Sequence, residues 1–165
     1  MNSAADPPSE PSQPSEPSEQ LSTVDGLAQL SFVIQGLLER RAGEQQISII
    51  QTRLLGVLRD RTPTMNELAT LLGLDKSSAT GLVDRAERRD LVARVPSNSD
   101  RRVVLVDLTD AGRALVSVVS ARFEADVAAL LERLSPPDRS SLAGVVSRLL
   151  VAHADAHGVD LFPLA

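Results

Sequence analysis

The sequence predicts a mainly α-helical fold with a small β-wing: a winged helix-turn-helix flanked by long N- and C-terminal dimerisation helices. Residues 64–88 carry start and stop signals for two short helices joined by a tight turn. Residues 91–95 and 102–108 are β-branched and apolar, as strands are, and Pro, Ser, Asn and Asp separate them. Apolar residues recur at helical spacing before and after this region, which predicts long amphipathic helices.

The two short helices have explicit boundaries. Thr64 and Glu67 form a Thr-x-x-Glu capping box, and Gly73 supplies the left-handed residue that ends the first helix. Asp75 is placed to cap the second helix. The predicted buried stripe of that second helix is Ala79, Leu82, Val83 and Ala86.

The outward face of the second helix and the hairpin tip have the chemistry of DNA recognition. Short polar groups near a helix N-terminus can approach base edges, Lys76 suits a backbone phosphate, and Arg85 can reach a guanine edge or a phosphate. Two arginines at the hairpin tip suit a narrow minor groove, which concentrates negative potential, and Asp100 is placed to orient one guanidinium. The predicted DNA-binding residues are Lys76, Ser77, Ser78, Thr80, Gly81, Asp84, Arg85, Asp100, Arg101 and Arg102.

Simpler roles remain open for some of these charged residues. Asp100 has the alternative of an ordinary turn residue. Arg88 and Arg89 are expected to be a solvated helix end rather than DNA contacts.

Several of these signals occur together in a fixed order. The run from Met65 to Arg88 is followed by Leu-Val, then Asp-Arg-Arg, then Leu-Thr-Asp-Ala-Gly. This arrangement resembles the MarR (multiple antibiotic resistance regulator) family over roughly residues 47–115. The family's Asp-x-Arg at the wing is matched by Asp100 and Arg102, and its Leu-Thr-x-x-Gly by Leu108, Thr109 and Gly112. The resemblance implies a DNA-binding regulator whose terminal helices pack on a partner subunit.

Charge is distributed unevenly along the chain. The net charge is -5, and the first twenty residues contain four acids and no base. Residues 76–102 contain seven basic and four acidic side chains, a local balance of +3. Because phosphate binding responds to the local field, the acidic total does not exclude double-stranded DNA as a partner.

Composition excludes several other classes of protein. There is no cysteine, so disulfides, thiol switches and cysteine-based zinc sites are excluded. No run approaches the roughly 18 apolar residues of a membrane span, and the N-terminus lacks a signal-peptide pattern, so we expect a cytoplasmic protein without membrane partners. No glycine-rich phosphate loop, Ser-His-Asp grouping or paired-carboxylate pocket indicates an enzyme.

The predicted organisation has four parts. Residues 1–20 form a disordered Pro/Ser/Glu-rich tail, 21–46 an N-terminal dimerisation helix, 47–108 the winged helix-turn-helix, and 109–165 the C-terminal dimerisation helices. In a monomer the terminal helices would leave a large apolar face in water, so we expect a homodimer. The predicted dimerisation residues are Leu27, Leu30, Ile34, Leu142, Val145 and Leu149.

Two further kinds of site are weighed. His153 and His157 are four residues apart and could chelate zinc, but no third strong ligand is evident, so a packed or interfacial pair is favoured and no cofactor is expected. The family resemblance implies that a small lipophilic or aromatic anion binds between the dimer helices and the DNA-binding part. The sequence offers Phe32 or Phe123 as apolar lining, and Arg41 or Arg53 as anion partners.

The sequence therefore predicts a homodimeric, sequence-specific transcriptional regulator with a pseudopalindromic operator. A repressor is favoured over an activator, because occupying a promoter needs no further partner surface. Two alternatives stay open: an architectural or non-specific DNA-binding protein of the same fold, and a protein-interaction module whose wing does not touch DNA.

Overall fold

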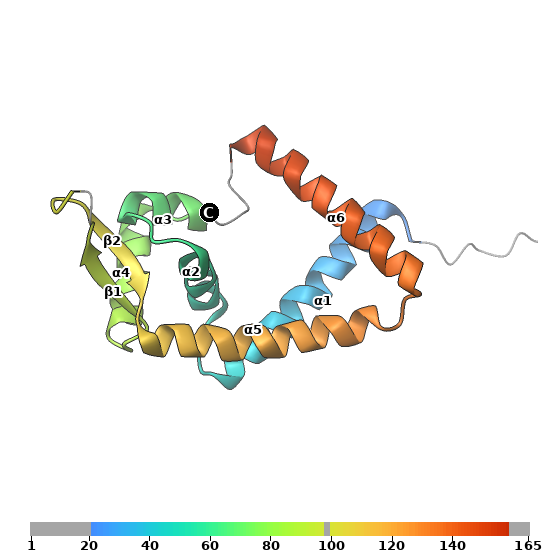
Figure 1. Cartoon of the computed structure of the whole chain (residues 1–165), viewed down its shortest axis with the longest axis horizontal. Coiled ribbons are helices and arrows are strands. Elements are labelled where there is room, and N and C mark those ends of the chain that lie inside the picture. The colour runs from blue at the N-terminus through green and yellow to red at the C-terminus, as the bar shows by residue number, and fades with distance from the viewer. Residues whose placement is uncertain (1–20, 98–99, 159–165) are drawn as a thin grey trace, which may run out of the picture.

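The computed structural model describes residues 21–97 and 100–158, so the predicted tail at residues 1–20 lies outside the described residues. Within these ranges the chain forms six helices and one two-stranded antiparallel sheet, which confirms the predicted fold class. Figure 1 shows the helices α2 to α4 and the hairpin gathered at one end, with α5 leading away from them toward α6. The elements are α1 (Thr23–Glu44), α2 (Ile49–Asp60), α3 (Met65–Leu72), α4 (Lys76–Glu87), β1 (Val92–Pro96), β2 (Val104–Leu108), α5 (Asp110–Leu131) and α6 (Pro136–His157).

The short helices begin and end where their capping signals are. Thr64 accepts from the backbone N–H of Glu67, whose carboxylate accepts from the backbone N–H of Thr64, which confirms the predicted capping box. Gly73 ends α3 in the left-handed region at φ 65°. Asp75 caps α4 as predicted.

The core lies between α2, α3, α4 and the hairpin, which together we call the reader. The stripe predicted for α4 is buried: Ala79, Leu82, Val83 and Ala86 are all at most 1% exposed. Three of them, Leu82, Val83 and Ala86, pack in one cluster that also contains Leu54 of α2, Leu68 of α3, and Val92 and Val106 of the two strands. Apolar burial from all the elements of the reader therefore holds α4 against the hairpin.

The second strand begins later than the sequence predicts, and the first lies one residue further along the chain. Strands were expected over residues 91–95 and 102–108, but β1 covers Val92–Pro96 and β2 begins only at Val104. The backbone N–H of Val103 donates to the carbonyl of Asp100, and that of Ser97 donates to the carbonyl of Val103. This turn takes Arg101 and Arg102 out of the strand and leaves them exposed at the tip.

The start of α5 is locked onto the end of α4. The side chain of Thr109 donates to the carbonyl of Asp90, and its backbone N–H donates to the carbonyl of Leu91. A Cβ on Gly112 would lie 2.0 Å from that same carbonyl oxygen of Leu91. Only glycine permits so close an approach, so the position of α5 follows the position of the reader.

The far end of α5 turns the chain toward α6. The helix ends at Leu131 with Glu132 as its C-cap. The backbone N–H of Leu134 donates to the carbonyl of Leu131 in a turn, and Ser135 then caps α6. The turn and the new cap together redirect the chain into α6.

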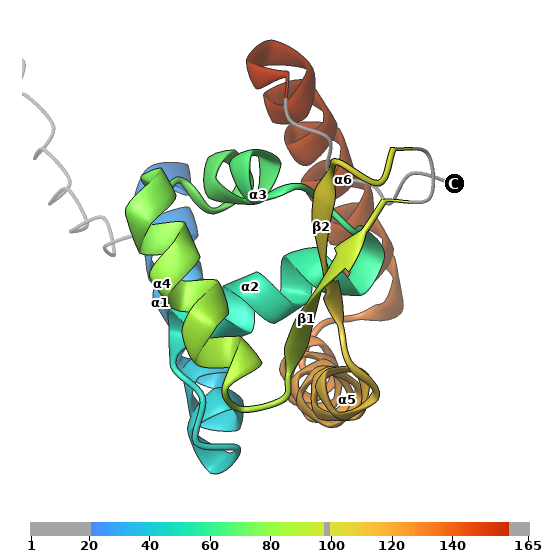
Figure 2. The same cartoon turned by 90° about the vertical axis from the view of Figure 1, so that its left-hand side faces the viewer.

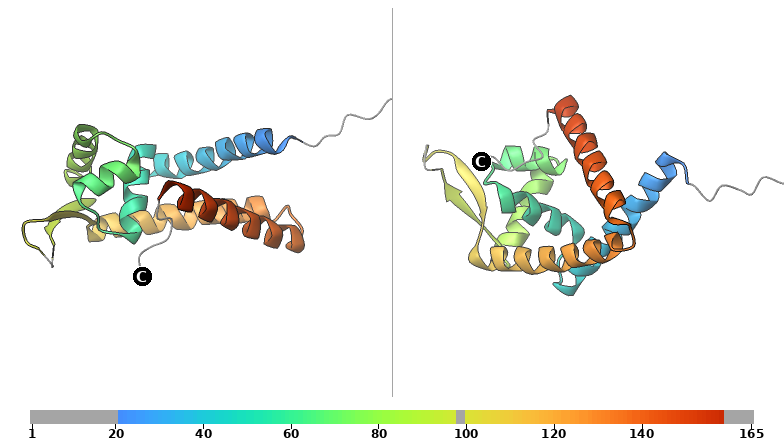
Figure 3. Two further views of the ribbon diagram at one scale, coloured as in Figure 1. Left: turned by 90° about the horizontal axis from the view of Figure 1, so that it is seen from above. Right: turned by 45° about the vertical axis from the view of Figure 1, so that its right-hand side comes forward.

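The helices α1 and α6 expose apolar side chains along their lengths. Figure 3 shows α1 and the α5–α6 pair projecting from the reader in the same direction. Leu27 and Leu30 of α1 and Val145 and Leu149 of α6 are 39–55% exposed, while Ile34 and Leu142 are half-buried. The predicted dimerisation residues therefore form an apolar surface that the single chain leaves largely uncovered.

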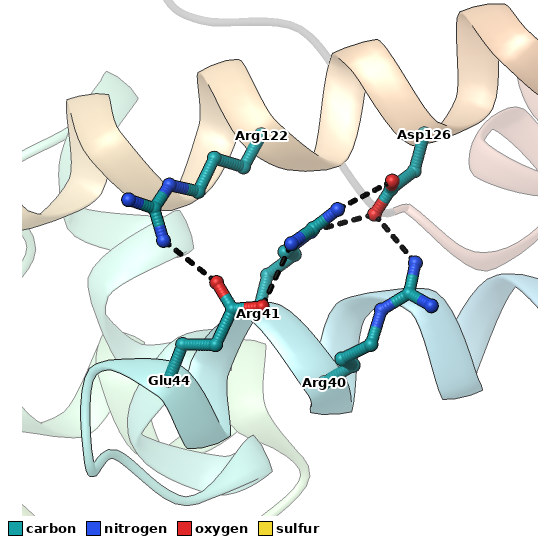
Figure 4. Close-up of polar contacts among 5 residues, drawn as sticks. All are labelled: Arg40, Arg41, Glu44, Arg122 and Asp126. Atoms are coloured by element: carbon teal, nitrogen blue, oxygen red, sulfur yellow. Dashed lines mark hydrogen bonds and ion pairs between the residues drawn. The ribbon is translucent and has the colours of Figure 1, made fainter.

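A network of five charged side chains joins α1 to α5 (Figure 4). Arg41 donates to both carboxylate oxygens of Asp126, and Arg40 donates to one of them at 3.1 Å. Glu44 accepts from Arg41 and from Arg122, each at 2.7 Å. Arg40 and Arg41, near the C-terminus of α1, therefore both pair with α5.

Candidate nucleic-acid interface

The N-terminal turn of α4 is exposed and held by Asp75. The Oδ1 atom of Asp75 accepts from the backbone N–H groups of Ser77 and Ser78, both at 2.9 Å. The two serine hydroxyls also donate to its carboxylate, at 2.6 and 2.7 Å. These hydroxyls, followed by the N–H groups, hold the pKa of Asp75 well below its usual range. The serines predicted to read bases thus have their protons turned toward the cap, and their lone pairs remain available to donors on DNA.

Further along α4, the residues predicted to bind DNA differ in how exposed their side chains are and in whether they are hydrogen-bonded within the helix. The hydroxyl of Thr80 donates to the carbonyl of Lys76 within the helix, and Thr80 is half-buried. The guanidinium of Arg85 lies back along the helix, since a Cβ on Gly81 would be 3.4 Å from its Nη1 atom. Lys76 and Arg85 are both exposed. The absence of a side chain at Gly81 leaves space for the Arg85 guanidinium close to the helix.

Asp84 is engaged within the protein. Its Oδ1 atom accepts from Nη2 of Arg94 on β1 at 2.7 Å, and Arg94 also pairs with Glu87. Sequence reasoning placed Asp84 on the DNA-facing surface and did not identify Arg94 or Glu87 as part of the site. The available signal was a pair of acids three apart on one helix face, followed by an arginine in an apolar strand.

The wing tip is exposed, and Asp100 organises its backbone. The Oδ1 atom of Asp100 accepts from the backbone N–H of Arg102 at 2.9 Å. Among the described residues no ion pair joins Asp100 to Arg101 or Arg102, so the predicted orienting of a guanidinium is not seen and the turn role is favoured. Asp100 instead shapes the loop that presents the two arginine side chains.

Arg89 is exposed, as expected for a solvated helix end, and its side chain also contacts another segment of the chain. Its Nη1 atom donates to the carbonyl of Gln46 at 2.8 Å, in the turn between α1 and α2, where Gln46 has φ 54°. Arg88 is exposed, as expected. Arg89 therefore fastens the end of α4 to the turn that follows α1.

Figure 2 looks directly at this end of the molecule and shows α4 and the hairpin side by side in front, with α1 and α6 behind them. Exposed on these two elements are Lys76, the two serines, Arg85 and the two tip arginines. A helix of this exposure fits a major groove, and a β-hairpin beside it can reach the adjacent minor groove. The exposed bases Lys76, Arg85, Arg101 and Arg102 on this face are accompanied by the exposed carboxylates of Asp75 and Asp100.

A cavity of about 240 Å³ lies between α1, α2 and α5. Its lining is mainly apolar and includes Phe123 and Arg53, two of the four residues named from the sequence. The other two do not line it: Phe32 is 71% exposed on α1, and Arg41 is paired with Asp126 and Glu44. Arg59 also lines the cavity, but its guanidinium is paired with Asp60 at 2.6 Å.

The described part of the chain contains neither a cluster of metal ligands nor a helix that could span a membrane. No group of three or more His, Asp and Glu residues gathers there as a metal site would require. His153 is exposed on α6, and the side chain of His157 lies outside what the structure describes. None of the described helices has the length and apolar character that crossing a membrane demands.

Known proteins of one family match this chain. The model of the MarR family matches residues 45–103, which include α2, α3, α4 and β1. The HTH-type transcriptional repressor NicR of Pseudomonas putida is 34% identical over 84 residues, 50% of this chain and 53% of NicR. The HTH-type transcriptional regulator YfiV of Bacillus subtilis is 30% identical over 108 residues, 63% of this chain and 68% of YfiV.

A solved structure shares the same fold. The F27L mutant of MepR from S. aureus, bound to an oligodeoxyribonucleotide, superposes with a TM-score of 0.58 at 20% identity. The superposition covers 81% of this chain and 99% of the MepR chain. The reader, the wing and the matched sequence agree with one another: the chain belongs to the MarR family of winged helix-turn-helix transcriptional regulators, which are not enzymes.

Proposed function

We propose that the protein is a homodimeric repressor that binds a pseudopalindromic DNA operator with α4 in the major groove and the wing in the minor groove. The observation that carries this proposal is that α4, with its exposed polar and basic residues, and the hairpin, with two exposed arginines at its tip, lie at the same end of the molecule. The repressor NicR, whose match to this chain spans about half of its own length, supports repression as the direction of regulation.

The side chains on this face suit distinct tasks. Lys76 stands at the first turn of α4, where an ammonium group meets a backbone phosphate. Arg85 is long enough to reach a guanine edge, where a guanidinium donates to O6 and N7. Arg101 and Arg102 extend from the tip, where a narrow minor groove attracts cations. Phosphate contacts set the position on DNA, and base contacts set the sequence preference.

The exposed apolar surface of α1 and α6 supports a dimer. Large side chains on both helices are exposed in the single chain, with Leu27 at 51% and Leu149 at 55%. Burying such a surface in a two-fold interface removes it from water and fixes the two readers relative to each other. Two recognition helices about 34 Å apart, one turn of DNA, would then read a pseudopalindrome.

The cavity between α1, α2 and α5 supports regulation by a small anion. It adjoins α5, which is locked to the end of α4 through Thr109 and Gly112. An apolar molecule with one carboxylate suits a cavity lined by residues such as Leu55, Phe123 and Arg53. A ligand that binds better when the readers are wrongly spaced for DNA would release the repressor.

Binding-site selection with the purified protein on random duplex DNA tests the proposal. We expect a two-fold related consensus with half-sites about one helical turn apart. Replacing Arg102 with alanine should lower affinity for the selected duplex by about 1–3 kcal/mol. A binder without sequence preference would enrich no consensus, and a protein-interaction module would bind no duplex; either result would contradict the proposal.

A further inference from the structure

Arg94 lies on the inner side of the wing. In the β-ladder it is directly opposite Val106, whose side chain is fully buried in the reader. Residues directly opposite each other in an antiparallel pair have side chains on the same face of the sheet. The guanidinium of Arg94 is accordingly half-buried between the hairpin and α4 rather than exposed on the surface presented to solvent.

Arg94 forms ion pairs with two residues of α4. Its Nη2 atom donates to Asp84 at 2.7 Å and its Nη1 atom donates to Glu87. The other carboxylate oxygen of Glu87 accepts from the backbone N–H of Arg94 at 3.2 Å. One residue thus fastens strand to helix through both ends of a rigid, planar fork and through the main chain.

The opposite edge of the hairpin is fastened to α3. The backbone N–H of Val106 donates to the carbonyl of Pro63 at 2.9 Å, and Leu105 forms a β-bridge with Thr64, the N-cap of α3. The hairpin therefore connects α3 and α4 of the reader, with β2 held by the start of α3 and β1 held by α4. Loss of either attachment would leave the tip free to move relative to the recognition helix.

The same contact also balances charge close to the DNA-facing surface. Asp84 immediately precedes Arg85 on α4, and its side chain is 43% exposed. An unpaired carboxylate at this position would repel phosphate, whereas one paired with Arg94 repels it less. Arg94 therefore both attaches the wing to α4 and reduces the repulsion between Asp84 and DNA phosphate.

We propose that Arg94 is a positioning residue for DNA binding: by holding Asp84 and Glu87, it sets the wing relative to α4 so that Arg102 and the recognition helix engage one DNA site together. This inference rests on the proposed function, because it assigns the contact a role in that function's DNA complex. Arg94 is assigned no contact with DNA.

A contact that only stabilises the fold and a contact that positions the wing would give different results when Arg94 is replaced. If Arg94 only stabilised the fold, its loss would lower the melting temperature, and folded variants would keep the full effect of the wing-tip arginine. If it positions the wing, its loss should remove most of what Arg102 contributes. A double-mutant cycle between Arg94 and Arg102 separates these outcomes, since it measures the coupling between two sites directly.

The cycle uses a fluorescein-labelled duplex obtained by binding-site selection, and full-length variants whose folding is checked by circular dichroism. In the wild-type background Arg102→Ala should weaken binding about 5- to 150-fold. In the Arg94→Gln background the same change should weaken binding less than about threefold. Arg94→Lys keeps the charge without the fork and should give an intermediate coupling.

Arg113→Gln is the matched control. Arg113 pairs with Asp107 of β2 at 3.3 Å, so the variant removes the same charge from a wing contact that does not involve α4. The full cost of Arg102→Ala should persist in this background. An unchanged cost of Arg102→Ala in folded Arg94→Gln protein would overturn the inference.

Hydrogen exchange tests, without DNA, whether Arg94 holds the wing against α4. Its result can therefore be judged separately from the proposed function. Amides of β1 and β2 should exchange faster in Arg94→Gln than in wild type or Arg113→Gln, while those of α2 should not change. If wild-type protein binds no duplex, the proposed function fails. The hydrogen-exchange result alone then decides whether Arg94 attaches the wing to α4. If Arg94→Gln does not fold, Asp84→Asn with Glu87→Gln removes the same contact from the other side; unchanged exchange in that variant would overturn the inference.

Discussion

Arg41 of α1 and Asp126 of α5 are joined by two parallel hydrogen bonds, from Nε to Oδ2 at 2.7 Å and from Nη2 to Oδ1 at 2.6 Å. The two bonds fix the relative orientation of the side chains as well as their distance. Because α5 is locked to the end of α4, this pair connects the exposed apolar helix α1 to the reader through α5. The geometry of a dimer built on α1 would therefore depend on it.

Replacing Asp126 with asparagine should lower the melting temperature and make the difference from wild type depend on pH. The hydrogen bonds from Arg41, and then those from Arg40, lower the pKa of Asp126 from 3.8 to about 2. A folded-state pKa below the unfolded value gives stability that is complete above the unfolded pKa and is lost as pH falls through the folded one. The gap between wild type and Asp126→Asn should be full near neutral pH and close between roughly pH 4 and 2.

Thermal melts of both proteins across this pH range provide the measurement. Asp110→Asn is the control, because Asp110 is fully exposed and lies 3.7 Å from Arg113. Its melting temperature should follow wild type closely. A gap for Asp126→Asn that stayed constant down to pH 2 would show that the carboxylate gains no stability from Arg41.

Gly112→Ala should be strongly destabilising. The added methyl group would meet the carbonyl oxygen of Leu91 at 2.0 Å, and backbone cannot move aside as a flexible side chain can. We expect a loss of about 2 kcal/mol or more in the free energy of unfolding, by urea denaturation. Gly56→Ala is the matched control, since a Cβ there meets nothing within 4 Å and should stabilise α2 by about 0.5–1 kcal/mol. Equal effects of the two changes would refute the close approach of α5 to Leu91.

The features that could be predicted from the sequence were those determined by nearby residues. The cap at Thr64, the left-handed Gly73 and the cap at Asp75 each depend on positions within a few residues, so a short sequence pattern is sufficient. The buried stripe of α4 follows from helical periodicity in the same way.

The features that could not be predicted depend on contacts between distant segments. Nothing local to Arg41 indicates that its partner is Asp126, which is 85 residues away. Asp84 lies on the outward face of α4, and the helix pattern alone does not indicate that the hairpin folds back and places Arg94 against it. Helical periodicity identifies the face of a helix, whereas tertiary packing decides whether that face meets solvent or another element.

The cavity should bind a small aromatic carboxylate. In a thermal-shift screen of phenolic and benzoic acids, a ligand at a hundred times its Kd should add about 2.7 kcal/mol to the free energy of unfolding and raise the melting temperature. Arg53→Ala should reduce the shift, because it removes a guanidinium that lines the cavity. Arg139→Ala, an exposed arginine on α6, should not. A shift equally large in Arg53→Ala would place the ligand elsewhere.

Arg85 and Lys76 should affect DNA binding in different ways. Arg85→Ala removes a group able to read a guanine edge, so it should cost about 1–3 kcal/mol on the selected duplex and much less on random DNA. Lys76→Ala removes a phosphate contact, so it should weaken binding to both duplexes alike. It should also reduce the slope of the logarithm of the binding constant against the logarithm of the salt concentration by about one. Fluorescence anisotropy with selected and scrambled duplexes at several salt concentrations measures both effects. Arg85→Ala weakening both duplexes equally would mean that this side chain contacts phosphate, and sequence preference would then have to come from other groups on α4 or from the shape of the DNA.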